Sequence, residues 1–273
     1  MTIFFTKTCA RDWERCCYQM LAIRRFFPLT AHIVMIEDAE AAREKNGSWN
    51  EQFHVWAGDV SLGGLGPGTM LFSVERYMPE AMKIENPDLR QQYCKLMAPI
   101  VFGEDTIQLD SDMCPLPTQW RWADELFQTP GGLIRWNAPL ASKAMKPGVE
   151  NWAKAWLEGL EEDAEVAPDA LGLDYMRAQV GWYSARDLAR DFVNEVLGVD
   201  PVGRILSVVK GGHKFSEYQF LGIYANLTRR YGYAFVERAE TDPWLMHFTS
   251  KDRLEPHELE KLRKAAGLLK EGQ

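Results

Sequence analysis

The sequence lacks the long apolar segments that would place the chain in a membrane or direct it to secretion. No run of residues approaches the ~18 uninterrupted apolar positions of a membrane-spanning helix. The apolar start of the chain is interrupted at Lys7, which is too early for the hydrophobic region of a signal peptide. These absences predict a cytoplasmic protein without a transmembrane segment.

Paired cysteines and an excess of basic charge are also missing. The five cysteines are odd in number and show no C-x2-C spacing, so reduced thiols are predicted rather than a disulfide framework or a cysteine zinc site. Acidic residues outnumber basic ones by 39 to 31, and the net charge is −8. This balance argues against broad electrostatic attraction to nucleic acid or to anionic lipid.

The chain does have enough apolar residues for a large core, since 46% of its 273 residues are hydrophobic. Its beginning is typical of a strand, a helix and a strand, over residues 2–6, 12–27 and 32–36. This order predicts a βαβ unit and a parallel sheet that binds ligands at the carboxyl ends of its strands. The predicted fold class is α/β, with a Rossmann-type, mostly parallel sheet flanked by helices.

The remaining segments add short strands and a helical C-terminal half. A glycine-rich loop is expected at 58–68, because so many glycines do not suit regular structure. Periodicity predicts strands at 53–56, 100–102, 106–109 and 204–209, and helices at 88–96, 149–160, 185–197, 216–231 and 256–270.

Two carboxylates, Asp110 and Asp112, follow the predicted strand 106–109 directly. Residues two apart in an extended backbone point the same way, so both carboxylates can reach one hard cation. This pattern predicts a grip on a metal ion and a diphosphate.

The helix before this pair carries polar residues that suit the same ligand. Gln91 or Gln92 lies on one helical face with Lys95, at a spacing of three or four residues. Lys95 is expected to neutralise a phosphate, and one glutamine to bind a sugar hydroxyl.

Three blocks together resemble a known family: Gln91-Gln92-x-x-Lys95, Leu109-Asp110-Ser111-Asp112 and Phe215-Ser216-Glu217-Tyr218-x-x-x-Gly222. They look like the DUF6492 group of glycosyltransferase-like proteins with a GT-A fold, and the resemblance spans roughly residues 2–250. It implies that residues 1–125 bind a nucleotide-sugar donor and that residues 126–273 form the acceptor side of one continuous domain.

On the donor side, the resemblance makes Asp110 and Asp112 the ligands of Mn²⁺ or Mg²⁺, with Ser111 small enough for close approach of the backbone. It implies His247, in a late apolar strand, as a third metal ligand, because neutral imidazole suits Mn²⁺. A histidine satisfied within the core is the alternative. Lys251 is expected at the β-phosphate, or else at the surface.

The ends of the first two strands fall where a GT-A fold receives the nucleoside. The resemblance places Thr6 and Thr8 beside it, and Glu37 or Asp38 beside a uracil or ribose group. Hydrogen bonding within a turn is the alternative for the threonines, and solvation is the alternative for the two acids.

On the acceptor side, the resemblance gives Glu217 the acceptor hydroxyl, which it binds or deprotonates. The alternative is that Glu217 only favours a helix start through the helix dipole. His213, in a loop flanked by glycines, is the rival base.

The predicted function is a metal-dependent glycosyltransferase that moves a sugar from a nucleotide-sugar donor, preferably a UDP-sugar, to an acceptor hydroxyl on a glycan, small molecule or modified nucleobase. One alternative is a transferase that decorates a modified base within nucleic acid. Another is a metal-dependent phosphohydrolase, which would need a nucleophilic Asp after an early strand. The third is a nucleotide-sugar binding protein without catalytic activity.

Overall fold

The structure of the chain is a computed structural model. The described residues are 2–38, 68–117, 121–127, 134–137, 182–210, 215–228, 233–236, 245–247 and 256–268.

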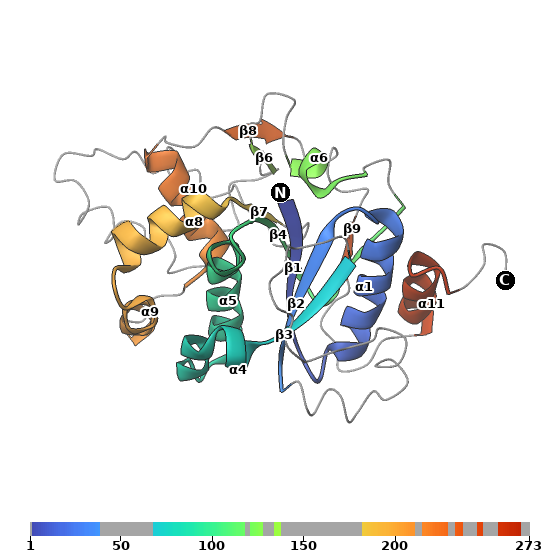
Figure 1. The fold of residues 1–273 in the computed structure, drawn as a ribbon, viewed down its shortest axis with the longest axis horizontal. Helices are drawn as coiled ribbons and strands as arrows, with labels where there is room; N and C mark the ends of the chain where they lie inside the picture. The colour runs from blue at the N-terminus through green and yellow to red at the C-terminus, as the bar shows by residue number, and fades with distance from the viewer. Residues whose placement is uncertain are drawn as a thin grey trace.

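A five-stranded sheet forms the centre of the molecule (Figure 1). Its strand order is β3-β2-β1-β4-β7, and the first four strands are parallel, whereas β7 runs antiparallel to β4. The strands are β1 (Thr2–Cys9), β2 (Ala31–Glu37), β3 (Gly68–Ser73), β4 (Asp105–Asp110) and β7 (Trp182–Ser184). The predicted α/β class with a mostly parallel sheet is confirmed.

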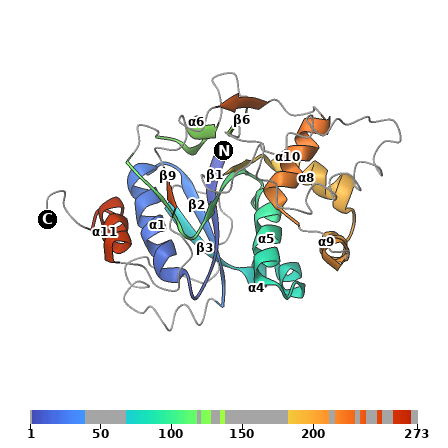
Figure 2. The same ribbon diagram turned by 180° about the vertical axis from the view of Figure 1, so that it is seen from behind.

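Helices cover both faces of this sheet, as the two opposite views show (Figures 1 and 2). One face carries α1 (Trp13–Phe26) and, outside it, α11 (Pro256–Ala265). The other face carries α5 (Pro87–Phe102), α8 (Arg186–Phe192) and α10 (Glu217–Thr228). Because both faces are covered, β1 and β2 are almost continuously buried, polar residues such as Thr6 and His32 included.

Shorter elements extend this core. Two further strand pairs lie outside the main sheet, one antiparallel between β5 (Met113–Pro115) and β9 (Leu245–His247), the other parallel between β6 (Ile134–Asn137) and β8 (Tyr233–Val236). The remaining helical segments are α4 (Val74–Tyr77), η1 (Pro79–Lys83), α6 (Ala123–Phe127), the π-helical η4 (Val193–Leu197) and α9 (Pro201–Lys210). Among the residues described, no helix is long and apolar enough to cross a membrane.

Two predicted strands are wrong, because both segments are helical. Residues 100–102 form the last turn of α5, which continues through Pro99 and ends at Gly103 in the left-handed conformation. Residues 204–209 lie in α9, where the Asp200 side chain accepts a hydrogen bond from the Gly203 amide (2.9 Å). In α9, the start signals Asp200 and Pro201 outweigh the strand preference of the later β-branched residues.

The other predicted elements fall into two groups. Helices predicted at 12–27, 185–197, 216–231 and 256–270 match described helices within a few residues, as does the strand predicted at 106–109. The helix predicted at 88–96 is correct in type but too short, because α5 continues to Phe102. The strand at 53–56, the helix at 149–160 and the loop at 58–68, except Gly68, lie outside the described residues. The sequence did not predict β3 or β7.

Thiol labelling tests this packing. Cys9 is half-buried, and the other four cysteines are buried. Burial raises the pKa of Cys94 to about 12 and also raises the pKa of Cys16, Cys17 and Cys114, so these thiols stay protonated near neutral pH. We expect DTNB to label one thiol rapidly in the native chain and the other four only after unfolding. Cys9→Ser should remove the rapid phase, and a rapid phase that survives it would contradict this packing.

Candidate functional site

The order of the strands marks where a ligand would bind. From β1 the chain adds β2 and then β3 on one side, and returns with β4 on the other side of β1. In open parallel sheets, ligands bind outside the carboxyl ends of the strands at the point where this order reverses. That point lies between β1 and β4, where Lys7 is in register with Asp110.

The two predicted carboxylates lie at this end of β4. Asp110 is the last residue of β4, Ser111 and Asp112 form the turn, and Met113 begins β5. Asp110, Ser111 and Asp112 are all half-buried. The D-x-D segment therefore lies at the switch point of the sheet.

Helix α5 supplies two side chains to Asp110. Gln91 Nε2 donates a hydrogen bond to Asp110 Oδ1 (2.7 Å), and Lys95 Nζ forms an ion pair with the same oxygen. Lys95 is only 3% exposed, so its charge depends on Asp110 for neutralisation. The helical face that the sequence predicted for a phosphate and a sugar thus contacts the first carboxylate of the D-x-D segment.

The neighbouring glutamine lies in a different environment. Gln92 Oε1 is buried and has no hydrogen-bond partner in the part of the chain that the structure describes. The sequence could not separate Gln91 from Gln92, because both spacings place a glutamine near Lys95 on a helix.

Lys95 also contacts one member of an aromatic pair. Lys95 Nζ lies 4.4 Å from the ring centroid of Trp182 in β7, and the Trp182 ring lies 5.3 Å from that of Tyr218 in α10. A cation over an indole face is stabilised by the ring quadrupole. The sequence assigned no role to Trp182, because nothing in its local pattern shows that β7 pairs with β4.

The start of α10 completes this group. Glu217 and Ser216 are buried, and Glu217 is the first residue of the helix. Burial raises the pKa of Tyr218, and the carboxylates of Glu217 and Asp110 raise it further. The three sequence blocks that carry the family resemblance therefore meet around Lys95, although more than 100 residues separate the first from the last.

The predicted nucleoside residues of β1, Thr6 and Thr8, are both buried. Thr6 is fully buried, and its hydroxyl contacts Gln19 Oε1 (2.7 Å) and His32 Nε2 (3.0 Å). Thr8 lies two residues closer to the carboxyl end, where its hydroxyl approaches the carbonyl oxygen of Cys9 (3.5 Å).

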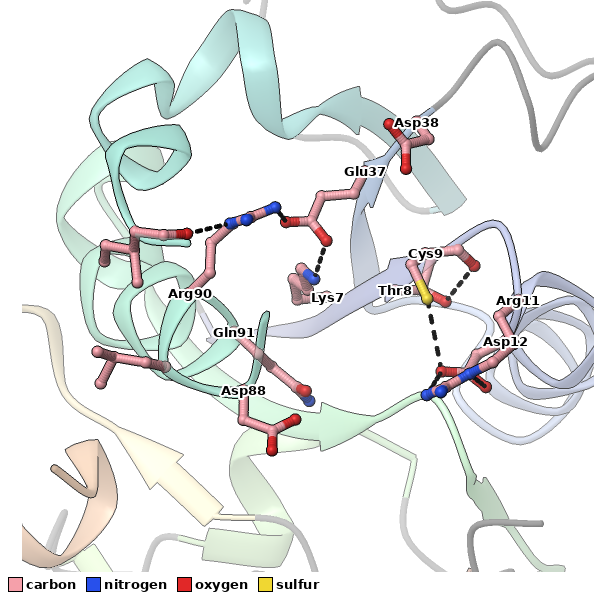
Figure 3. Close-up of polar contacts among 12 residues, drawn as sticks. Lys7, Thr8, Cys9, Arg11, Asp12, Glu37, Asp38, Asp88, Arg90 and Gln91 are labelled. Carbon is pink, nitrogen blue, oxygen red and sulfur yellow. Dashed lines mark hydrogen bonds and ion pairs between the residues drawn. The ribbon is translucent and has the colours of Figure 1, made fainter. Parts of the chain in front are cut away.

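Glu37, at the end of β2, is held between two cations (Figure 3). One carboxylate oxygen accepts a hydrogen bond from Lys7 Nζ and the other accepts one from Arg90 Nη1, both at 2.6 Å. Asp38 is exposed in a left-handed backbone conformation (φ 53°), and its amide donates to Glu75 Oε1 (3.1 Å). Of the two acids, Asp38 is the one with a solvent-exposed side chain.

Of three further predicted residues, only His247 lies within the described part of the chain. His213 and Lys251 lie outside the described residues. The backbone of His247 is described, and in the β5–β9 pair it lies opposite Met113, the residue after Asp112. Among the side chains described, no three His, Cys, Asp or Glu residues gather in a metal-binding arrangement.

The chemistry of the D-x-D segment fits Mn²⁺ or Mg²⁺, which prefer carboxylate oxygens. Both contacts to the Asp110 side chain go to Oδ1. Oδ2 accepts no hydrogen bond from the described residues, and this leaves an oxygen that suits a cation.

No protein-family model matches the chain, and no curated protein sequence is significantly similar to it. The resemblance to DUF6492 therefore stays a prediction.

Several solved glycosyltransferase structures are similar to the chain. The galactosyltransferase LgtC in complex with donor and acceptor sugar analogues is 12% identical, with a TM-score of 0.47 over 98% of this chain and 96% of that one. The bifunctional glycosyltransferase WbbM is 13% identical, with a TM-score of 0.45 over 97% and 51% of the two chains. The glycosyltransferase GlyE of Streptococcus pneumoniae is 11% identical, with a TM-score of 0.43 over 97% and 60%. At these values the likeness by itself assigns no activity.

Proposed function

We propose that the chain is a metal-dependent glycosyltransferase that moves a sugar from a nucleotide-sugar donor, preferably a UDP-sugar, to an acceptor hydroxyl. The observation that carries this proposal is the place of Asp110 and Asp112 at the switch point of a parallel sheet, where α/β folds bind nucleotides. Lys95, Gln91 and the start of α10 surround the same point.

In this proposal, Asp110 and Asp112 hold Mn²⁺ or Mg²⁺, and His247 is the third ligand. The register of β5 with β9, which brings the His247 backbone beside Met113, supports the choice of His247. The metal, when bound, supplies charge neutralisation for the departing diphosphate. Ser111, between the two acids, leaves room for the donor to approach the backbone.

Lys95 sets the charge of this site. With Asp110 it forms a neutral pair that Trp182 covers, so water has little access to the ammonium group. A diphosphate that reaches Asp110 meets the Lys95 charge in a poorly solvated place, where electrostatic attraction is strong. Gln92 is proposed to bind a donor hydroxyl, because its buried Oε1 has no partner among the described residues. Lys251 is proposed to contact the β-phosphate.

The nucleoside is proposed to lie across the ends of β1 and β2. Thr8 and Asp38 are its candidate partners, because they lie at the carboxyl edge of the sheet (Figure 3). Thr6 and Glu37 act from behind them, since their polar side-chain atoms already contact other side chains.

Glu217 is the proposed acceptor-side residue, with His213 as the rival base. Glu217 is buried at the start of α10 and next to Tyr218, whose pKa reflects the Asp110 charge. Because the charges of Glu217 and Asp110 both act on Tyr218, we assign Glu217 to the same reaction centre as the metal-binding acids. This arrangement supports a donor half of residues 1–125 and an acceptor half of residues 126–273 within one domain.

Ligand-dependent stability tests this function. UDP with Mn²⁺ should raise the melting temperature, because a ligand that binds only the folded state stabilises it, and EDTA should abolish the shift. Incubation with a panel of UDP-sugars should release UDP. Release of UMP and a sugar phosphate would instead identify a phosphohydrolase, and the absence of any shift with nucleotides or nucleotide sugars would contradict the proposal.

A further inference from the structure

A buried glutamine on α1 contacts both ends of the D-x-D turn. Gln19 Nε2 donates hydrogen bonds to the carbonyl oxygen of Asp110 (2.6 Å) and to that of Met113 (2.5 Å). These carbonyls flank Ser111 and Asp112, so the two protons of one amide group bridge the whole turn. Gln19 is 0% exposed, and no water competes for these contacts.

The orientation of the Gln19 amide is fixed from the other side. Thr6 Oγ1 donates its hydroxyl proton to Gln19 Oε1 (2.7 Å). Thr6 has no second proton, so its 3.0 Å contact with His32 Nε2 requires the histidine to donate. Burial lowers the pKa of His32 to about 3, and the neutral ring therefore carries its proton on Nε2.

These assignments determine which group donates in each hydrogen bond of the series. It runs from His32 to Thr6, from Thr6 to Gln19, and from Gln19 to the two carbonyls of the turn. All three side chains are fully buried. A flipped Gln19 amide would place its oxygen against two carbonyl oxygens and its NH₂ group against the Thr6 donor, so only one orientation is compatible with the surroundings.

We infer that Gln19 is a positioning residue that fixes the D-x-D turn for the divalent cation, an inference that rests on the proposed function. The turn has to present the carboxylates of Asp110 and Asp112 to one ion, and their separation depends on the backbone between them. By tying both ends of the turn to α1, Gln19 sets that backbone. The hydrogen bond from Gln19 to Met113 also fixes the start of β5, and the His247 backbone lies opposite Met113.

Gln19→Met tests this role, because it deletes both donors at nearly unchanged volume. Gln108→Met is the matched control. Gln108, in β4, is also fully buried, and its Nε2 donates hydrogen bonds to the carbonyl oxygen of Lys95 (3.1 Å) and to the Thr106 hydroxyl, neither of which belongs to the turn. Gln19→Met loses three buried hydrogen bonds, including the one that Gln19 accepts from Thr6, and Gln108→Met loses two, so Gln19→Met should lose somewhat more stability.

Two measurements separate positioning from general destabilisation. Hydrogen exchange followed by mass spectrometry, without metal, should show faster exchange over residues 110–114 in Gln19→Met than in Gln108→Met. Titration with Mn²⁺ alone, read by electron paramagnetic resonance, should show an affinity about 10–100-fold weaker in Gln19→Met, the usual effect of losing a residue that orients metal ligands. Excess Mn²⁺ should then restore most of the lost kcat.

The outcomes are distinct. Mn²⁺ affinity in Gln19→Met equal to that of the wild type, or lost equally in Gln108→Met, would overturn the positioning role. A wild-type chain that binds no Mn²⁺ would overturn the proposed metal dependence instead. In that case the exchange rates alone decide whether Gln19 holds the turn.

Discussion

Asp112→Asn should lower sugar transfer by about 10²–10³-fold, the range seen when one preorganised electrostatic contact to a transition state is removed. Asparagine keeps the shape of the side chain but removes the negative charge that would bind the cation. We expect the unfolding free energy to change much less than the activity, because Asp112 is half-buried at a turn. Initial rates of UDP release, measured across a Mn²⁺ titration, test the prediction.

Asp112 is a better test than Asp110. Asp110→Asn would also leave the buried Lys95 ammonium without its ion-pair partner, so loss of activity and loss of stability would be mixed. Asp124→Asn is the matched control, because Asp124 is an exposed acid in α6, outside the D-x-D turn. If Asp112→Asn transfers sugar at the wild-type rate with the same Mn²⁺ dependence, the proposed metal site is wrong.

Glu37→Gln should destabilise the fold by about 3–5 kcal/mol, the range for breaking a buried ion pair by removing one partner. The side chains of Lys7 and Glu37 are only 5% and 7% exposed. Neutral glutamine would leave the charges of Lys7 and Arg90 close together with little solvent to screen them. Urea unfolding, followed by tryptophan fluorescence, measures the change.

Two further variants control this experiment. Glu80→Gln removes an ion-pair partner from an exposed pair with Lys83, and the unfolding free energy should stay close to that of the wild type, because solvent screens the pair. The double variant Lys7→Met with Glu37→Leu removes both buried charges and should recover much of the loss. Arg90 then keeps its contacts to the carbonyl oxygens of Ile84 and Glu85. Equal stability of Glu37→Gln and the wild type would mean that this cluster is well solvated.

Local signals predicted much of the fold. The buried strands β1 and β2 contain short apolar runs, and α1 and α11 show helical periodicity, because each of these patterns lies within one element. Residues 204–209 show the limit of this approach. Their β-branched run favours a strand, but helix-start residues upstream and the burial of Val202 and Ile205 favour α9.

In the candidate site, too, local spacing predicted some features and long-range contacts decided others. The sequence by itself determined the D-x-D pair and the α5 face that carries Lys95, because spacing along one strand end or one helix fixes which side chains lie together. It also determined that a parallel sheet would present strand ends on one edge.

Only the tertiary structure decided what these residues contact. Trp182 reaches Lys95 through a strand pairing that no local pattern encodes, and Gln91 rather than Gln92 contacts Asp110. Gln19 was not predicted at all, because a polar residue inside an amphipathic helix gives no sign of the distant backbone that it holds. Long-range contacts depend on how the strands are ordered and how the helices pack, and the spacing of residues along the chain does not specify either.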